Sequence, residues 1–232
     1  MTVAFDAASA SASVTTDPFS WTHTPAGTPK GVIVWVVGVA VGDQIASVTY
    51  GALTLTQATG SPVLTGAGES INCHAFYGLA SIPTGAQTVT VDKTTGTNPY
   101  VGMCITVTAV ADTQIDDTDA TINSTAVADP SVTLSTGGLT CLAAIGFGSG
   151  QDAVTGITPL SGWTSRAEVD FGSLTCGCYT YDTIASSDVT AGWTQTSEDA
   201  AAIAFLISDT DAGGGGEVLV DIIGMGLIPF PR

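Results

Sequence analysis

An uninterrupted apolar run, GVIVWVVGVAV at Gly31–Val41, is the feature that most constrains how this chain folds. The run is too short to cross a bilayer, which takes about 20 residues. It is dense in β-branched residues and follows the turn-forming pair Pro29-Lys30. A strand that is covered on both faces has this composition, because neither face alternates with polar residues. The run therefore predicts a central strand of a β-sandwich.

Short strands separated by turn residues are predicted along most of the chain. Tyr100–Val110 has the clearest alternation, with Val101, Met103 and Ile105 on one face. Further strands are expected at Thr2–Phe5, Phe19–His23, Ala46–Tyr50, Ala52–Thr56, Ile71–Leu79, Gln87–Asp92, Val132–Leu134, Leu139–Phe147, Trp163–Val169, Leu174–Tyr181, Thr190–Gln195 and Ala200–Ile207. No segment shows a sustained apolar stripe at a spacing of 3.6 residues, so we expect little helix. The pattern predicts an all-β fold, an antiparallel, jelly-roll-like β-sandwich with an extended C-terminal arm.

Two segments in different halves of the chain resemble each other in spacing. Cys73-His-Ala-Phe-Tyr-Gly-Leu-Ala-Ser81 is similar to Cys178-Tyr-Thr-Tyr-Asp-Thr-Ile-Ala-Ser186, and each follows a long apolar strand and a loop. The similarity indicates either two related halves of the sheet system or chance in a chain rich in Thr and Ala.

The charge balance excludes some classes of partner. The formal net charge is −17, and the positive side chains are Lys30, Lys93, Arg166 and Arg232. Nucleic-acid binding depends chiefly on Lys and Arg that neutralise phosphates. Attachment to an anionic membrane surface needs the same charges. We therefore expect no nucleic-acid partner and no membrane partner.

Cysteine usage and the N-terminus indicate the folding compartment. The chain has five cysteines, and MTVAFDAASASAS has neither the basic n-region nor the apolar h-region of a signal peptide. An odd number of cysteines without such a signal favours reduced thiols in a reducing cytosol.

Four regions are predicted from composition. They are residues 1–12, an N-terminal arm or edge strand; 13–209, the β-sandwich domain; 210–216, a Gly-rich tether; and 217–232, an apolar C-terminal docking arm. Gly213–Gly216 is not a phosphate loop, because no Gly-Lys-Ser/Thr follows it. It is typical of a flexible tether.

The arm, EVLVDIIGMGLIPFPR at Glu217–Arg232, is the predicted partner-binding element. Its apolar side chains are Val218, Leu219, Val220, Ile222, Ile223, Leu227, Ile228 and Phe230. Burying each would contribute roughly 1.5–3 kcal/mol, against about 1–2 kcal/mol per residue for ordering the backbone. A preformed groove or sheet edge would favour docking. The arm either returns to its own sandwich as a last strand or docks on a neighbouring subunit, and the loose tether favours the neighbour.

Several motifs together resemble a family of jelly-roll or concanavalin-like β-sandwiches found in phage virion proteins and bacterial surface proteins. They are Ser20-Trp-Thr-His-Thr-Pro25, the strand Gly31–Val41, Val48-Thr-Tyr-Gly51, Pro83–Val91, the Asp-rich link after Ala109, and the closing strand Ala200–Ile207. The resemblance covers roughly residues 13–208. It implies a β-sandwich and supplies no catalytic residues to transfer. The acidic balance and the long C-terminal extension depart from the typical member.

Candidate catalytic residues are few. His23 and His74 are the only histidines, and the sequence has no G-x-S-x-G nucleophile elbow. His23 shares a strand face with Phe19 and Trp21, so we interpret it as a partly buried packing residue. His74 follows Cys73 and therefore lies on the opposite face of the strand, which argues against a Cys-His nucleophile pair.

Candidate ligand sites also have simpler interpretations. Cys176-Gly-Cys178 lacks the C-x₂-C spacing of zinc pairs and is better explained as core cysteine. Asp112, Asp116, Asp117 and Asp119 lack an EF-hand loop, so we interpret them as a solvated link rather than a calcium site. Trp21, Trp163 and Trp193 offer a sugar platform only if they lie outside the core. We therefore predict no catalytic residues, no metal site and no cofactor.

These observations predict a non-enzymatic structural protein of a phage virion. Its role would be capsid decoration or cement, or that of another head or tail accessory component, assembled in the host cytoplasm. Its partners would be copies of itself and other virion proteins, contacted through the arm. The alternative is a carbohydrate-binding or adhesin module, for which a glycan partner has no direct support in the sequence. An enzyme is the third hypothesis. Head or tail location and oligomeric order stay open.

Overall fold

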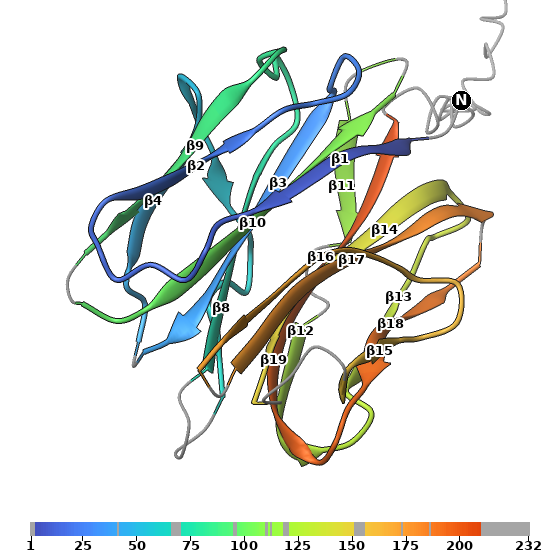
Figure 1. Cartoon of the computed structure of the whole chain (residues 1–232). Helices are drawn as coiled ribbons and strands as arrows, with labels where there is room; N and C mark the ends of the chain where they lie inside the picture. The colour runs from blue at the N-terminus through green and yellow to red at the C-terminus, as the bar shows by residue number, and fades with distance from the viewer. Residues whose placement is uncertain are drawn as a thin grey trace, which may run out of the picture.

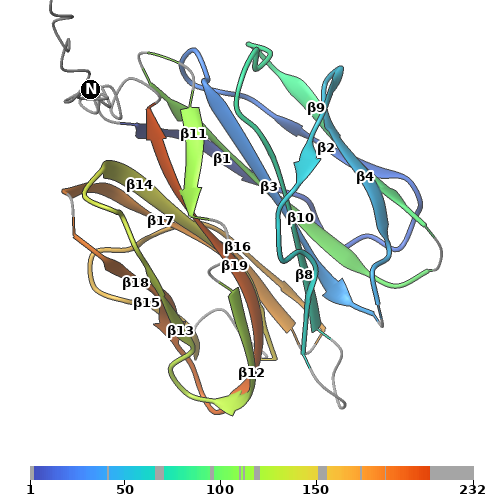
Figure 2. The same cartoon turned by 180° about the vertical axis from the view of Figure 1, so that it is seen from behind.

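The computed structural model shows four β-sheets stacked in layers (Figures 1 and 2). It describes residues 3–40, 42–65, 71–94, 97–109, 111, 113–117, 121–150, 156–172, 174–185 and 187–209. Every paired strand within these residues runs antiparallel to its neighbour, and the described residues contain no α-helix. This confirms the all-β, antiparallel sandwich predicted from the sequence.

The first ten strands build an N-terminal sandwich. They are β1 (Ala4–Ala10), β2 (Phe19–His23), β3 (Gly31–Val39), β4 (Ile45–Tyr50), β5 (Leu53–Thr54), β6 (Thr56–Gln57), β7 (Val63–Leu64), β8 (Ile71–Gly78), β9 (Gln87–Lys93) and β10 (Tyr100–Thr108). The A sheet has the order β1-β10-β3-β8-β6, with β7 also paired to β8. The B sheet has the order β2-β9-β4-β5.

The remaining strands build a C-terminal sandwich. They are β11 (Thr113–Asp117), β12 (Thr121–Val127), β13 (Ser131–Leu134), β14 (Thr140–Ser149), β15 (Thr158–Pro159), β16 (Thr164–Phe171), β17 (Leu174–Ala185), β18 (Val189–Thr194) and β19 (Glu198–Asp209). The C sheet has the order β11-β19-β14-β17-β16, with β12 also paired to β19. The D sheet has the order β13-β18-β15.

The two sandwiches share one topology. In each larger sheet, the strand that comes first in the sequence of that half pairs with the strand that comes last in it. That last strand pairs on its other side with the long apolar strand, β3 or β14. The long apolar strand in turn pairs with the strand that carries the repeated cysteine segment. Thus β1, β10, β3 and β8 correspond to β11, β19, β14 and β17. The similar segments that begin at Cys73 and Cys178 lie on the equivalent strands β8 and β17. The structure therefore supports two related halves as the origin of the similarity.

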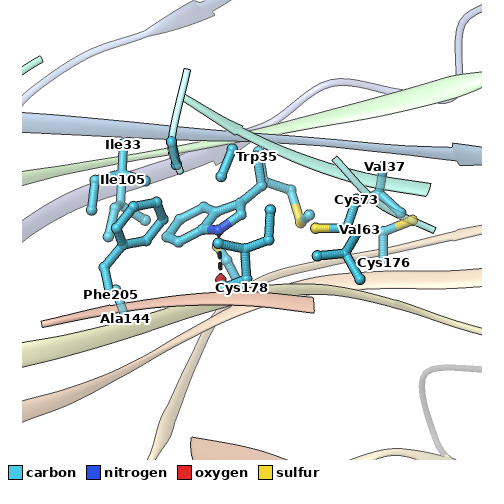
Figure 3. Close-up of a cluster of buried hydrophobic side chains, with 14 of the residues drawn as sticks. Ile33, Trp35, Val37, Val63, Cys73, Ile105, Ala144, Cys176, Cys178 and Phe205 are labelled. Carbon is cyan, nitrogen blue, oxygen red and sulfur yellow. Dashed lines mark hydrogen bonds between the residues drawn. The ribbon is translucent and has the colours of Figure 1, made fainter. Parts of the chain in front are cut away.

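Three apolar cores hold the four layers together. One fills the N-terminal sandwich, one the C-terminal sandwich, and the third lies between the A and C sheets. Trp35 is at the centre of the third core and Phe205 packs against it, with ring centroids 5.8 Å apart (Figure 3). Because both faces of β3 and β14 are covered by other sheets, both strands are apolar along nearly their whole length. The prediction that Gly31–Val41 contains a central, doubly covered strand is confirmed by β3.

One segment differs from the prediction. Asp112–Asp119 was expected to be a solvated link, yet it contains β11, which pairs with the end of β19. A second strand, β12, follows it and pairs with the first part of β19. Neither segment has a long apolar run, because each is an edge strand that needs only one neighbour. Strand pairing there is set by β19, which is a tertiary effect that the local sequence does not display.

Candidate functional sites

The first buried polar site among the described residues surrounds His23, at the end of β2. Its side chain is fully buried. Its Nδ1 lies 2.8 Å from Ser9 Oγ of β1, and its Nε2 lies 3.1 Å from Thr106 Oγ1 of β10. The prediction that His23 packs in the interior is confirmed, and the two hydrogen bonds are a feature that alternation alone did not reveal.

The hydrogen bonds around His23 run in one direction. Trp21 Nε1 donates to Ser9 Oγ at 3.1 Å, and Thr106 Oγ1 donates to Asp6 Oδ2 at 2.8 Å. With those donors fixed, Ser9 donates to His23 Nδ1, and the Nε2–H of His23 donates to Thr106. The ring is therefore the neutral Nε2–H tautomer. Burial lowers the pKa of His23 to about 4, against an opposing effect of the Asp6 carboxylate, so the ring is neutral at pH 7.

This chain of hydrogen bonds connects two sheets at one side of the molecule. Asp6 and Ser9 belong to the edge strand of the A sheet, whereas His23 belongs to the edge strand of the B sheet. Asp6 also accepts a hydrogen bond of 2.7 Å from the backbone N–H of Gly27. The arrangement holds β1 to the B sheet and turns the one carboxylate of β1 toward the sandwich.

His74 has a contrasting environment. Its ring is fully buried, and its Nδ1 lies 3.5 Å from Asp43 Oδ1 at the β3–β4 turn. Neither ring nitrogen makes a hydrogen bond. Burial lowers the pKa of His74 to about 4, and the Asp43 carboxylate opposes that shift. Cys73 enters the core between the sandwiches whereas His74 faces the N-terminal sandwich, so the expected opposite faces are confirmed.

The cysteines are core residues. All five are buried and free of disulfides. Cys176 and Cys178 point into the same core between the sandwiches, where Cys73 also lies (Figure 3). Burial raises the pKa of the Cys178 thiol to about 12. The interpretation of Cys176-Gly-Cys178 as core packing is confirmed, and within the described residues no group of three or more His, Cys, Asp or Glu side chains is placed to hold a metal ion.

The tryptophans are also placed by the structure. Trp193 is fully buried in the C-terminal sandwich and stacks on Phe147 with ring centroids 4.2 Å apart. Trp163 is buried in the same core and donates a hydrogen bond of 2.9 Å to the carbonyl of Thr190. Trp21 is half-buried against Gly102. Core packing of Trp163 and Trp193, which the sequence favoured over a sugar platform, is confirmed.

Two sets of predicted residues are not placed. Asp112 and Asp119 lie outside the described residues, and the side chains of Asp116 and Asp117 in β11 do as well. The predicted partner-binding residues of the arm, within 217–232, also lie outside the described residues.

The last described residue, Asp209, shows where the chain leaves the described strands toward the tether and the arm. Asp209 ends β19 opposite Thr113 of β11, and its Oδ2 accepts a hydrogen bond of 3.2 Å from the N–H of Ala111. Thr113 Oγ1 in turn donates to the carbonyl of Lys30 at 2.9 Å, and Lys30 precedes β3. The described chain therefore ends beside the end of the A sheet at which β3 begins.

Comparisons of the chain with protein-family models, with curated proteins and with solved structures find no match. A search of the described residues for helices long and apolar enough to span a membrane also finds none.

Proposed function

We propose that this chain is a non-catalytic structural protein of a phage virion, a decoration or cement protein or another accessory component, which attaches to neighbouring subunits through its C-terminal arm. The four-layer body supplies a rigid module, and the arm at 217–232 supplies the contact. The resemblance of the strand and turn motifs to virion β-sandwiches and the acidic balance of the chain support the proposal.

The observation that carries the proposal is the contrast between body and arm. The body fills three apolar cores with its own side chains, and Val39 is the single large apolar residue that is exposed among the described residues. The arm adds nine large apolar side chains, Met225 among them, within sixteen residues of sequence, Glu217–Arg232. Because the described body buries its own large apolar side chains without the arm, we infer that the arm gains its burial on another molecule.

A truncated chain that ends at Asp211 tests the proposal. We expect this chain to keep the unfolding midpoint of the full-length protein but to lose self-association in light scattering and to stay in the supernatant when phage particles are sedimented. In the full-length chain, the double substitution Val220→Asp and Ile222→Asp should have the same effect as truncation. Met225→Leu is the matched control, because it keeps the arm apolar.

Two results would overturn the proposal. One is normal assembly and normal particle association of the truncated chain. The other is a large loss of stability on truncation, which would show that the arm belongs to the core of its own sandwich.

A further inference from the structure

We infer that the arm of one copy adds a strand to the outer edge of β1 in a second copy. This inference depends on the proposed function and names the surface that receives the arm. β1 ends the A sheet and pairs on one side with β10. The backbone groups on its other side face away from the sheet, and in Figure 1 the strand crosses the front of the molecule. An exposed edge of this kind is a template for an incoming strand.

The composition of β1 distinguishes it from the other edges near the origin of the arm. β1 is AFDAASA, and its one charged side chain, Asp6, is turned inward by its bonds to Thr106 and Gly27. Edge strands without outward charge or proline are those least protected against pairing. From Ala7 to Ala10 the side chains of β1 are all small, so they would not crowd the bulky Val, Leu and Ile of the arm.

Other edges are less suited to the arm. β16 carries three charged residues, Arg166, Glu168 and Asp170, whereas β1 carries one. β15 contains Pro159, which lacks an N–H. β11 has five residues, against seven in β1, and therefore offers a shorter edge. β12 pairs with the first half of β19, away from the origin of the arm at Asp209.

The location of β1 also fits the origin of the arm. Asp209 is opposite Thr113, which bonds to Lys30, and the N–H of Lys30 donates to the carbonyl of Val107 at 2.8 Å. Val107 is opposite Phe5 of β1. The tether that leads to the arm therefore starts, after Asp209, on the side of the molecule where β1 begins.

Distance and strand direction favour a second copy over the same chain. Residues 210–216 span at most about 25 Å when fully extended. Within one chain, an arm that reached the start of β1 would run parallel to it. Antiparallel addition, which continues the pattern of the A sheet, requires the arm to begin beyond Ala10 and to run back toward Ala4. To begin there, the tether would use nearly its full extended length on the run along β1, roughly 23 Å, and would also have to cross the strands that separate Asp209 from Phe5. A neighbouring copy has no such limit.

Amide exchange in the full-length protein tests the site directly. The N–H of Ser11 donates inward to the carbonyl of Gly102 at 2.8 Å, so by alternation the N–H groups of Ala8 and Ala10 point outward. We expect their exchange, measured by NMR, to slow at least tenfold as the protein concentration rises through the association range. Protection that does not depend on concentration would show addition within one chain and would overturn the second copy as the occupant.

A proline on the edge provides a second test. Ala8→Pro removes one outward N–H and no hydrogen bond to β10, so it should weaken self-association at least tenfold. Ala8→Ser is the matched control and should leave association unchanged. Thermal unfolding of both variants shows whether the body is intact. If Ala8→Pro does not fold, Ala10→Pro and the amide exchange of the unsubstituted chain decide.

The outcomes separate this inference from the proposed function. If truncation at Asp211 abolishes association while Ala8→Pro does not, and the Ala8 amide exchanges freely, then the arm docks elsewhere. The β1 site would then be wrong and the assembly role would stand. If truncation has no effect on association, both are wrong.

Discussion

Trp35 of β3 lies directly against Gly146 of β14, and this pair joins the two sandwiches. A Cβ on Gly146 would overlap the indole ring, and the ring nitrogen donates a hydrogen bond of 2.9 Å to the carbonyl of Ile203 in β19 (Figure 3). Val37 is opposite Cys73 and Val101, and Gly146 is opposite Cys178 and Ile203, so Val37 and Gly146 occupy equivalent positions in the two halves. The C-terminal sandwich therefore has a glycine, Gly146, where the N-terminal sandwich has Val37, and this glycine leaves space for the Trp35 indole of the N-terminal sandwich.

This contact predicts that Gly146→Ala destabilises the protein. The added methyl group would overlap the fully buried indole ring of Trp35. Overpacking of a core costs about 1–3 kcal/mol, and displacement of Trp35 would also weaken its bond to Ile203. We expect a loss of about 2–4 kcal/mol in the free energy of unfolding, measured by urea denaturation.

Gly150→Ala is the matched control for this substitution. The nearest atoms to a Cβ at Gly150 are 3.6 Å away, which is ordinary van der Waals contact. The control should change the free energy of unfolding by less than about 0.5 kcal/mol. Equal stability of the two variants would show that the sandwiches separate easily at Trp35.

Local periodicity predicted much of the fold. The central strand β3 was predicted because burial on both faces requires a continuous apolar run. The strand β10 was predicted because its apolar residues recur at every second position. The stacking of two sandwiches was not predicted. The faces of β3 and β14 that meet across the sandwiches are as apolar as the faces that meet within each sandwich, so composition cannot tell one layer from the next.

The polar sites were less predictable than the strands. His23 and His74 are both fully buried, and alternation predicted an interior position for His23. The hydrogen bonds of His23 come from Ser9 and Thr106, which are far away in sequence and are brought together only by the pairing of β1 with β10. The residues next to His23 in the sequence therefore do not predict its hydrogen-bond partners. The repeated cysteine segment was the one sequence signal of the duplicated topology.

The two buried histidines predict a loss of stability in mild acid. The pKa of each is about 4 in the folded protein and about 6.5 when unfolded. The unfolded chain therefore binds more protons between these values, so the stabilisation is present above pH 6.5 and is lost as the pH falls toward 4. Each histidine contributes a slope of up to about 1.4 kcal/mol per pH unit.

Urea denaturation at pH 7.5 and pH 5.0 measures this effect. Relative to pH 7.5, the wild-type chain should lose roughly 2 kcal/mol per histidine at pH 5.0. The double variant His23→Gln and His74→Gln should be less stable at pH 7.5 and should lack this part of the pH dependence. Both chains carry the same carboxylates, so the difference in the pH dependence of their free energies of unfolding gives the contribution of the histidines. An identical pH dependence in both chains would contradict the burial of neutral imidazoles.

Arg166 predicts a second coupling between the sandwiches. Its guanidinium lies over the ring of Phe5, 3.8 Å from the centroid, and its Nε donates to Thr180 Oγ1 at 2.7 Å. Phe5 is in β1 of the A sheet and Arg166 is in β16 of the C sheet. Arg166→Ala should lower the free energy of unfolding by about 1–2 kcal/mol, and a double-mutant cycle with Phe5→Leu should give a coupling of about 0.5–2 kcal/mol. A coupling of zero would show that the ring contact adds nothing to the ion pair with Asp182.

The buried thiols predict that the native protein does not react with a thiol reagent. All five cysteines are buried, and burial raises the pKa of Cys104 and Cys176 well above the usual value. The thiolate is the reactive form, so both access and ionisation oppose the reaction. At pH 8, Ellman's reagent should label no cysteine in the native chain and five after unfolding in guanidinium.

Because Cys73, Cys176 and Cys178 lie between the sandwiches, Gly146→Ala should speed their labelling more than that of Cys104 and Cys141, which lie within single sandwiches. Uniform acceleration of all five would instead indicate that the two sandwiches unfold as one cooperative unit.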